Sequence, residues 1–387
     1  SLVIDEAVRM RASDIHIEPM SNRVRVRYRI DGVCIERDTI PTSMQGSVLS
    51  RLKIMAGIDI AEKRLPQDGR IKKPVGKAII DFRVSSCPAY HGESIVLRIL
   101  RSDAVNVGVT GLGLEQDHYE KFTSTIRQPN GIFLVTGPTG SGKTTTLYAA
   151  LQELNRPNRK IITAEDPVEY NFPGMNQCQV REEIGLSFAR ILRAMLRQAP
   201  NVILVGEIRD REVGEVAIQA ALTGHLVFST LHTNDAPSAI TRLIDMGIKP
   251  FLVASSIQAI LAQRLVRVIC KECREIDPAP DKFMLKLCGI TDKDLQGQHI
   301  YRGAGCNRCS GLGYRGRQGI FEFMELSNEI RELAFNRAST TQIRRVARAG
   351  GMRNLLDDGK LKILRGITTP EEIARLAQAE GVIMEDV

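Results

Sequence analysis

A run of eight residues combines three glycines, a lysine and a threonine at the spacing of a phosphate-binding loop. It fits the pattern Gly-x-x-x-x-Gly-Lys-Ser/Thr, and it lies between an apolar run and a helix-forming run, which is the context this motif requires. The glycines let the backbone wrap around a phosphate with its N–H groups pointing inward, and the start of the helix adds a positive dipole. The predicted nucleotide-binding residues are Gly137, Pro138, Thr139, Gly140, Ser141, Gly142, Lys143, Thr144 and Thr145.

Two members of this run have specific predicted tasks. In phosphate loops of this type the lysine reaches the β- and γ-phosphates, and the hydroxyl of the following residue is a ligand of Mg²⁺. We therefore assign the phosphate contact to Lys143 and the Mg²⁺ contact to Thr144. The predicted ligands are ATP and Mg²⁺.

Acidic residues follow two further apolar runs, where a nucleotide site in an open α/β sheet is expected. Glu165, Asp166 and Glu169 follow one run, and Glu207 follows the other. Hydrolysis requires a group that activates water and carboxylates near the metal. Because Gly206 stands where many phosphate-loop ATPases have the metal-directing aspartate, Glu165 or Asp166 is expected to share that task. The sequence leaves open whether Glu165 or Glu207 activates water, and Glu169 is a secondary candidate.

Two of the six histidines flank the predicted strand that begins at Leu226. A histidine at the end of a strand usually has only a structural role. His232, however, lies in a Leu-His-Thr-Asn run whose polar groups suit a sensor of the γ-phosphate. We predict that role for His232 and retain His225 as a secondary candidate.

Arginines provide the remaining candidates. Arg193 and Arg197 share one face of a predicted helix, opposite an apolar stripe. Such a face is usually only solvated, but arginine is well suited to bidentate phosphate contacts across an interface. Arg83 and Arg98 lie on predicted strands near the N-terminus, and they are arginine-finger candidates if that domain docks over the phosphate loop of a neighbouring subunit. Arg209, in a Gly-Glu-Ile-Arg-Asp run, is a further secondary candidate.

Four of the eight cysteines form two Cys-x-x-Cys pairs, Cys270 with Cys273 and Cys306 with Cys309. Four thiolates suit tetrahedral Zn²⁺, and a closed shell of four leaves no open position for chemistry. The sequence shows no secretory signal, so a structural metal site is favoured over disulfides, with a redox pair as the alternative. Cys288 lies between the two pairs and has no predicted partner.

Apolar periodicity predicts two domains that position these groups. Residues 1–103 are expected to form a small α/β domain, residues 104–113 a linker, and residues 114–387 a second domain in which alternating strands and helices indicate a mostly parallel sheet. The predicted strands of the first domain are 14–18, 23–30, 78–84 and 94–100, with a helix within 42–60. Those of the second are 131–136, 160–164, 202–205 and 226–230. A cysteine-rich insert is expected over 265–318, and C-terminal helices over 324–387.

Composition restricts the function classes. A hydrophobic fraction of 43% and a charged fraction of 25% are ordinary for a globular protein. The net charge of +8 permits an anionic partner, but the absence of Trp and an aromatic content of 5% disfavour a protein that stacks single-stranded bases. No uninterrupted apolar run is long enough for a membrane span. The first residues already have a helical pattern, so we expect that an upstream portion is missing.

Together these motifs resemble the secretion and pilus ATPases of the PilT/GspE superfamily. The resemblance covers nearly the whole chain and rests on the runs 64–70, 137–144, 161–169, 206–210, 224–234 and 262–267. It implies a RecA-like P-loop ATPase domain preceded by a small PAS-like α/β domain, with a zinc-binding insert and a helical C-terminus. It also implies that Arg83, Arg98, Arg193 and Arg197 match family arginines.

The resemblance further implies a homo-hexamer in the cytoplasm, peripheral to the inner membrane. Its expected partners are an inner-membrane platform protein and other components of the machinery. The cysteine insert is similar to that of extension and secretion motors, which disfavours a retraction motor. Overall similarity favours a type IV pilus assembly ATPase, with a type II secretion ATPase as the alternative. A nucleic-acid translocating ATPase and a nucleotide-gated scaffold are the less favoured hypotheses.

Overall fold

The computed structural model describes residues 2–76, 78–101 and 107–379 of the chain. It divides into two compact units, Ser1–Ala104 and Val105–Val387. Residues 104–106 of the predicted linker and the last residues of the predicted C-terminal helices, 380–387, lie outside the described residues. Within the predicted linker, the structure forms the short helix α3 (Gly108–Gly111).

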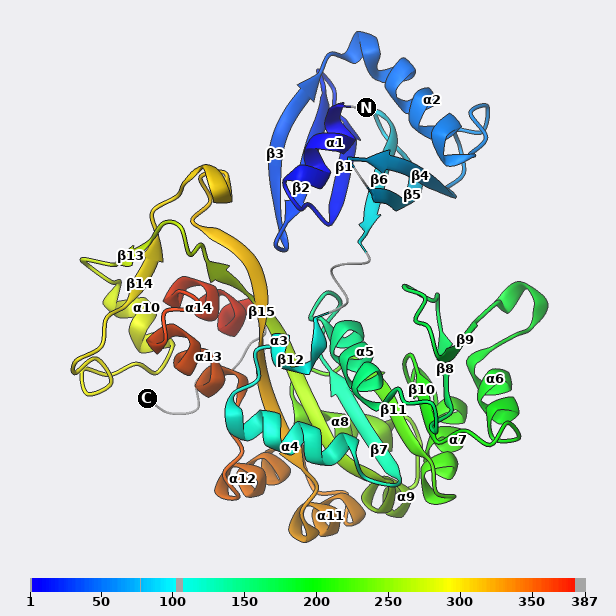
Figure 1. Cartoon of the computed structure of the whole chain (residues 1–387), viewed down its shortest axis with the longest axis vertical. Helices are drawn as coiled ribbons and strands as arrows, with labels where there is room; N and C mark the ends of the chain where they lie inside the picture. Colours follow the sequence, from blue (N-terminus) through cyan, green and yellow to red (C-terminus); the bar gives the residue numbers. More distant parts are fainter. Residues whose placement is uncertain (1, 77, 102–106, 380–387) are drawn as a thin grey trace. The chain divides into compact units, whose positions relative to one another are not determined.

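The first unit contains a six-stranded sheet in the order β3-β2-β1-β6-β5-β4, and every neighbouring pair is antiparallel. The predicted hairpin near the N-terminus is confirmed, with Ile17 paired to Val26. Figure 1 shows this unit at the blue end of the colour scale. Its elements are α1 (Leu2–Arg9), β1 (Asp14–Pro19), β2 (Val24–Ile30), β3 (Val33–Ile40), η1 (Thr42–Met44), α2 (Gln45–Ala56), β4 (Gln67–Val75), β5 (Ala78–Ala89) and β6 (Gly92–Leu100).

Both helices of this unit pack on one face of its sheet. The buried Tyr28 of β2 donates its hydroxyl hydrogen bond to the carbonyl of Val3 in α1, at 2.9 Å. On α2, the buried Lys53 forms an ion pair of 2.7 Å with Glu93 of β6. Because side chains alternate along a strand, the opposite face of the sheet carries the charged residues, among them the predicted Arg83 and Arg98.

The second unit contains a seven-stranded sheet in the order β15-β12-β7-β11-β10-β8-β9. Every neighbouring pair is parallel except β12 with β15. The four strands predicted from the sequence are confirmed, and the mixed α/β fold class is confirmed with them. The strands are β7 (Gly131–Thr136), β8 (Ile161–Glu165), β9 (Met175–Gln179), β10 (Val202–Val205), β11 (Leu226–Leu231), β12 (Ile257–Ile269) and β15 (Tyr314–Glu325).

Helices cover both faces of this sheet (Figure 1). Residues of β7 alternate between the two layers: Ile132 and Leu134 belong to one core, and Phe133 and Val135 to the other. One core includes α4 (Gln116–Ile126) and α5 (Lys143–Leu154). The other includes α6 (Phe188–Met195), α7 (Arg211–Leu222), α8 (Ala236–Asp245), α9 (Pro250–Ser256), α11 (Asn328–Phe335) and α12 (Thr340–Ala349).

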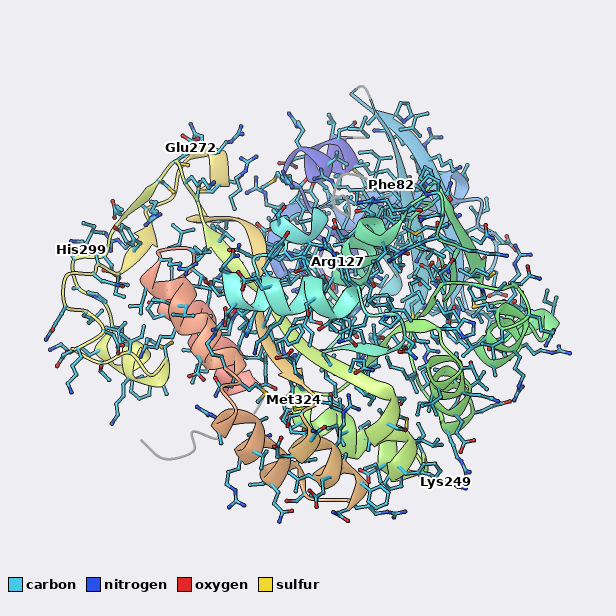
Figure 2. The ribbon with its side chains drawn as sticks, turned by 60° about the horizontal axis from the view of Figure 1, so that its bottom comes forward. Phe82, Arg127, Lys249, Glu272, His299 and Met324 are labelled. Carbon is cyan, nitrogen blue, oxygen red and sulfur yellow. The ribbon has the colours of Figure 1, made fainter. Side chains whose placement is uncertain are left out.

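The predicted cysteine-rich insert is shorter than the sequence suggested. Its first and last residues belong to β12 and β15, which pair from Ala259 with Glu325 to Ile269 with Tyr314. Residues 270–313 lie between these strands, and Figure 2 shows Glu272 and His299 there, away from Met324 at the other end of β15. They contain β13 (Arg274–Ile276), α10 (Lys282–Leu287), β14 (Tyr301–Gly303) and η4 (Asn307–Cys309). This segment packs on α13 (Leu355–Leu364) and α14 (Pro370–Ala379).

We expect the substitution Phe133→Ala to destabilise the second unit by about 3–5 kcal/mol, because it removes a fully buried ring that contacts Phe122, Phe228 and Phe323. Urea unfolding followed by circular dichroism measures the change. The matched control is Phe283→Ala, whose ring is 62% exposed and should change stability by about 0.5 kcal/mol or less. Equal effects of the two substitutions would contradict the assignment of this core.

Candidate functional site

The phosphate loop leaves the carboxyl end of β7 and enters α5. Gly137, Gly140 and Gly142 all have positive φ angles, at 147°, 80° and 90°, which are conformations that other residues rarely adopt. Pro138 and Thr139 are exposed at the tip of the loop. The nine predicted residues therefore form a glycine-dependent turn followed by a helix start, as the motif requires.

Lys143 folds back over this turn. Its Nζ donates to the carbonyl oxygens of Gly137, at 2.7 Å, and Pro138, at 3.0 Å. Burial lowers the pKa of Lys143 to about 8; the carboxylate of Glu207 opposes this shift and the guanidinium of Arg264 adds to it. Both charged groups therefore lie within electrostatic reach of the lysine. Along the same helix start, Ser141 is buried, Thr144 is exposed and Thr145 is half-buried.

The carboxyl ends of four parallel strands meet at the edge of the sheet where this loop lies. Thr136 of β7 pairs with Leu231 of β11, and Val205 of β10 pairs with both Ser229 of β11 and Ala164 of β8. The residues that follow these strands are consequently neighbours. They include His232 after β11, Glu207 after β10, and Asp166 after Glu165, the last residue of β8.

Four predicted residues form one charged cluster at this edge. His232 Nε2 lies 3.2 Å from Glu207 Oε2. Arg209 pairs with the other oxygen of Glu207, and its second nitrogen lies 3.6 Å from Asp166 Oδ2. The side chain of Glu207 is 17% exposed, so it remains accessible to a small molecule. The cluster thus presents an oriented carboxylate next to a histidine and within electrostatic reach of Lys143.

Glu165 has a different environment. It is buried, and its carboxylate accepts hydrogen bonds from Thr163 Oγ1 at 2.5 Å, Gln177 Nε2 at 3.1 Å and the hydroxyl of Tyr148. Burial, followed by the charge of Glu165, raises the pKa of Tyr148. Because Tyr148 lies on α5, this carboxylate ties β8 and β9 to the helix that follows the phosphate loop. Glu169 lies half-buried in the connection from β8 to β9.

The structure does not bring the other histidine to this cluster. His225 precedes β11, so it lies at the opposite edge of the sheet from His232. Its Nδ1 is 2.9 Å from the carbonyl oxygen of Ala220 in α7. The contacts described for His225 thus connect the end of α7 to the start of β11.

Arg193 and Arg197 lie on α6, as predicted, and have contacts away from the cluster. Arg193 pairs with Glu212 of α7 at 2.7 Å, and Arg197 donates to the carbonyl oxygen of Arg193 at 3.0 Å. Both side chains are exposed on the surface of the second unit.

Arg83 and Arg98 lie opposite each other on neighbouring strands of the first unit. A third arginine, Arg70, continues this row, and it was not predicted from the sequence. Arg70 of β4 pairs in register with Arg83 of β5, which pairs with Arg98 of β6. These three arginines line a depression of about 510 Å³. On one side Asp14 contacts Arg98 Nε at 3.1 Å. Like charges directly opposite each other destabilise a sheet, so this row is suited to an anionic ligand.

Two further residues beside the phosphate loop were not assigned a role from the sequence. Gln263 and Arg264 of β12 are each 2% exposed. Gln263 accepts a hydrogen bond from Thr146 Oγ1 and donates one to the carbonyl oxygen of Ser141, both at 2.7 Å. The signal that could have found them is a pair of polar residues inside the otherwise apolar run 259–266.

The four predicted cysteine ligands converge between β12 and β15, with all four sulfur atoms within 4.8 Å of one another. The closest sulfur pairs are Cys306–Cys309 at 3.7 Å, Cys273–Cys309 at 3.8 Å and Cys270–Cys306 at 3.9 Å. A tetrahedral site with Zn–S bonds of about 2.3 Å requires sulfurs about 3.8 Å apart, whereas a disulfide requires about 2 Å. The donor set therefore fits zinc.

Backbone groups support the same interpretation. Burial opposes ionisation of Cys309, but hydrogen bonds from the backbone N–H groups of Cys306, at 3.2 Å, and Gly313, at 3.3 Å, lower its pKa below the ordinary range. Cys288 is separate from this cluster: it is fully buried and donates to the carbonyl oxygen of Pro370 at 3.3 Å. Cys288 is thus a packing residue between the insert and α14.

The chain is similar to a family of secretion proteins and to characterised pilus and secretion ATPases. The family described as type II/IV secretion system protein matches residues 1–375. The chain is 47% identical to the type IV pilus assembly ATPase PilB of Thermus thermophilus, over 96% of this chain and 42% of that protein. It is 49% identical to the type II secretion system protein E of Pseudomonas aeruginosa, over 98% of this chain and 74% of that protein. The chain thus spans less than half of the first relative.

Solved structures share this fold. The pilus retraction motor PilT with bound ADP has a TM-score of 0.62 and 27% identity, covering 97% of this chain and 95% of that chain. The ATPase DotB of Legionella pneumophila has a TM-score of 0.70 at 21% identity, covering 97% and 94%, and supports the fold alone. Among the described residues, no helix has both the length and the apolar character needed to cross a membrane.

We expect purified protein to contain about one zinc ion per chain, because the four sulfurs already have the separations of a tetrahedral site. Elemental analysis after washing with a weak chelator measures the content, and Cys306→Ser should lose most of it. Cys288→Ser is the matched control, because that thiol lies outside the cluster, and it should retain zinc. A zinc-free wild-type protein would contradict the metal assignment.

Proposed function

This chain belongs to the type II/IV secretion system protein family, and on that premise we propose that it is an ATP-hydrolysing motor that drives assembly of a pilus or pseudopilus. The observation that carries the proposal is the cluster of Glu207, His232, Arg209 and Asp166 at the sheet edge next to Lys143. The names of the relatives, which include pilus assembly and secretion ATPases, support the same function. The ADP bound to PilT supports a nucleotide as the ligand.

Each part of the site has a task in this proposal. The backbone of the glycine turn binds the phosphates, and Lys143 leaves its two loop carbonyls to contact the β- and γ-phosphates. Thr144 would hold Mg²⁺, which neutralises charge on the phosphates when bound, and Asp166 would supply a carboxylate near the metal. Because preorganised charges stabilise a transition state without reorganisation, the ion pairs that orient Glu207 favour catalysis.

We assign water activation to Glu207 and not to Glu165. Glu207 is partly accessible and is oriented by Arg209 and His232. Glu165 is buried with three hydrogen-bond donors, so a positioning role through Tyr148 suits it better. We assign the role of γ-phosphate sensor to His232. Because His232 contacts Glu207, a terminal phosphate bound next to Glu207 would also lie near the imidazole of His232.

We further propose that six copies assemble in the cytoplasm, peripheral to the inner membrane, against a platform protein. In that assembly the row of Arg70, Arg83 and Arg98 contacts the nucleotide of a neighbouring copy, because a row of three arginines suits an anionic ligand and arginines supplied in trans stabilise the transferred phosphate. Arg193 and Arg197, exposed on α6, are candidates for the interface itself.

Between the two machines we favour type IV pilus assembly, with type II secretion supported equally by the names of the relatives. Both machines polymerise pilin-like subunits, so the nucleotide chemistry is the same in each. Deleting the gene distinguishes them: loss of surface pili supports the first, and loss of exoprotein release supports the second.

We expect Lys143→Ala and Glu207→Gln each to lower ATP turnover at least about 100-fold, because one removes the phosphate contact and the other the general base. Glu207→Gln should retain ATP binding. Phosphate release and fluorescent-nucleotide binding measure the two properties. Glu215→Gln, an acid of α7 whose partner is Arg211, is the control and should keep full turnover. Turnover unchanged in Glu207→Gln would refute this assignment.

Mixing two inactive variants tests action in trans. Glu207→Gln subunits retain the arginine row, and Arg83→Ala/Arg98→Ala subunits retain the phosphate loop and Glu207. If the arginines act on a neighbouring copy, mixed assemblies should regain measurable ATP turnover that neither variant shows alone. The control mixture pairs Glu207→Gln with Lys143→Ala. Each of these subunits lacks a residue of its own nucleotide site, so no site in the mixture has all its residues and the mixture should stay inactive. No recovery in the first mixture would contradict the trans arrangement.

A further inference from the structure

A buried arginine connects β12, the strand on which the phosphate loop lies, to the loop that carries His232. Arg264 is 2% exposed. Its Nη1 donates to the carbonyl oxygen of Gln263 at 2.9 Å, and its Nη2 donates to that of Asn234, also at 2.9 Å. Asn234 is two residues after His232. One planar guanidinium therefore fixes the distance between β12 and the segment that follows β11.

The β12 end of this bridge is in direct contact with the phosphate loop. A Cβ atom added to Gly137 would lie 2.6 Å from the carbonyl oxygen of Gln263 and 3.0 Å from Arg264 Nη1, so only glycine fits there. The side chain of Gln263 also bonds to Ser141 and Thr146, at 2.7 Å each. The loop thus rests on β12 at its first glycine and at the start of α5.

The other end of the bridge is anchored to the body of the unit. Asp235 caps α8 through Ser238 N and pairs with Arg344 of α12, at 2.7 and 2.8 Å. Glu322 of β15 accepts a hydrogen bond of 2.7 Å from Ala236 N. These contacts hold the segment after Asn234 in place. The position of His232 relative to the phosphate loop therefore depends on a small number of residues, with Arg264 between them.

We propose that Arg264 is a positioning residue for ATP hydrolysis, which sets the separation between the phosphate loop and His232 and thereby aligns Glu207 with the terminal phosphate. This inference rests on the proposed hydrolysis. Thr136 makes a second, uncharged connection, since its hydroxyl lies 2.7 Å from that of Thr233. Arg264 differs from Thr136 because its guanidinium donates to two separate carbonyl oxygens. The compact ammonium group of a lysine cannot reproduce this pair of hydrogen bonds.

The test compares two variants, Arg264→Lys and Arg264→Gln, with the wild-type protein. We expect kcat to fall at least about 10-fold while the KM for ATP and the affinity for fluorescent ADP stay within about 3-fold, because a small misplacement of catalytic groups mainly costs rate. The matched control is Arg267→Gln on the same strand, which removes an arginine whose ion pair of 2.6 Å is with Glu372. It should keep kcat within about 2-fold of wild type.

A double-mutant cycle shows whether Arg264 acts through His232. If it does, the double variant Arg264→Lys/His232→Ala should have the same kcat as His232→Ala alone. The reason is that His232→Ala already removes the alignment of Glu207 that Arg264 supports. Three results would each overturn the proposal. The first is that the two substitutions lower kcat independently, so that their fold-changes multiply. The others are that Arg264→Lys keeps the wild-type kcat, or that it loses ADP affinity as strongly as it loses kcat. A wild-type protein that does not hydrolyse ATP would instead refute the proposed function.

If the variants do not fold, hydrogen exchange on the wild-type protein decides the matter. A non-hydrolysable ATP analogue should slow amide exchange at 232–236 and 262–265 together, relative to ADP. Slowing confined to the phosphate loop, 137–146, would overturn the proposal.

Discussion

Parallel pairing of β7, β11, β10 and β8 is the constraint on which the rest of this structure depends. Parallel strands all end at the same edge of a sheet, so residues that are far apart in the chain become neighbours there. The phosphate loop, His232, Glu207 and Asp166 each follow one of these strands. The strands are buried on both faces by helices, which is why they consist mostly of apolar residues and why the charged groups gather only where the strands end.

The same constraint separates two acids that look equivalent in the sequence. Glu165 is the last residue of β8, and its carboxylate is enclosed by Thr163, Gln177 and Tyr148. Glu207 lies two residues beyond the end of β10, where the chain has left the sheet and the side chain reaches a partly open surface. A difference of two residues relative to a strand end therefore separates a carboxylate that holds α5 in place from one that can contact a reactant.

The long antiparallel pair β12 and β15 links the phosphate loop to the cluster of four cysteines. Gln263 of β12 contacts the phosphate loop through Ser141, and Cys270 follows the end of the same strand. A metal bound by all four cysteines would close the segment between the two strands and thereby fix their ends. The segment also packs against α13 and α14, so the C-terminal helices support the far end of the strands on which the loop lies.

The sequence by itself determined the groups whose function depends on local spacing. The phosphate loop, the Cys-x-x-Cys pairs and the four buried parallel strands follow from residue order within short windows, because a turn, a metal knuckle or a buried strand requires particular residues at fixed offsets. Windows of this kind could not detect β3, an edge strand that has no fully buried residue and no clear alternation. They also could not limit the cysteine-rich segment to 270–313, because the ends of β12 and β15 are defined by pairing between distant residues.

Only the tertiary structure decided which distant residues meet. It joined Glu207 to His232, placed His225 at the opposite edge of the sheet, and brought Arg264 to Asn234 across 30 residues. It also aligned Arg70 with the two arginines predicted from the sequence of the first unit. Strand order and register set these contacts, and both depend on the packing of the whole sheet and not on any single segment of the chain.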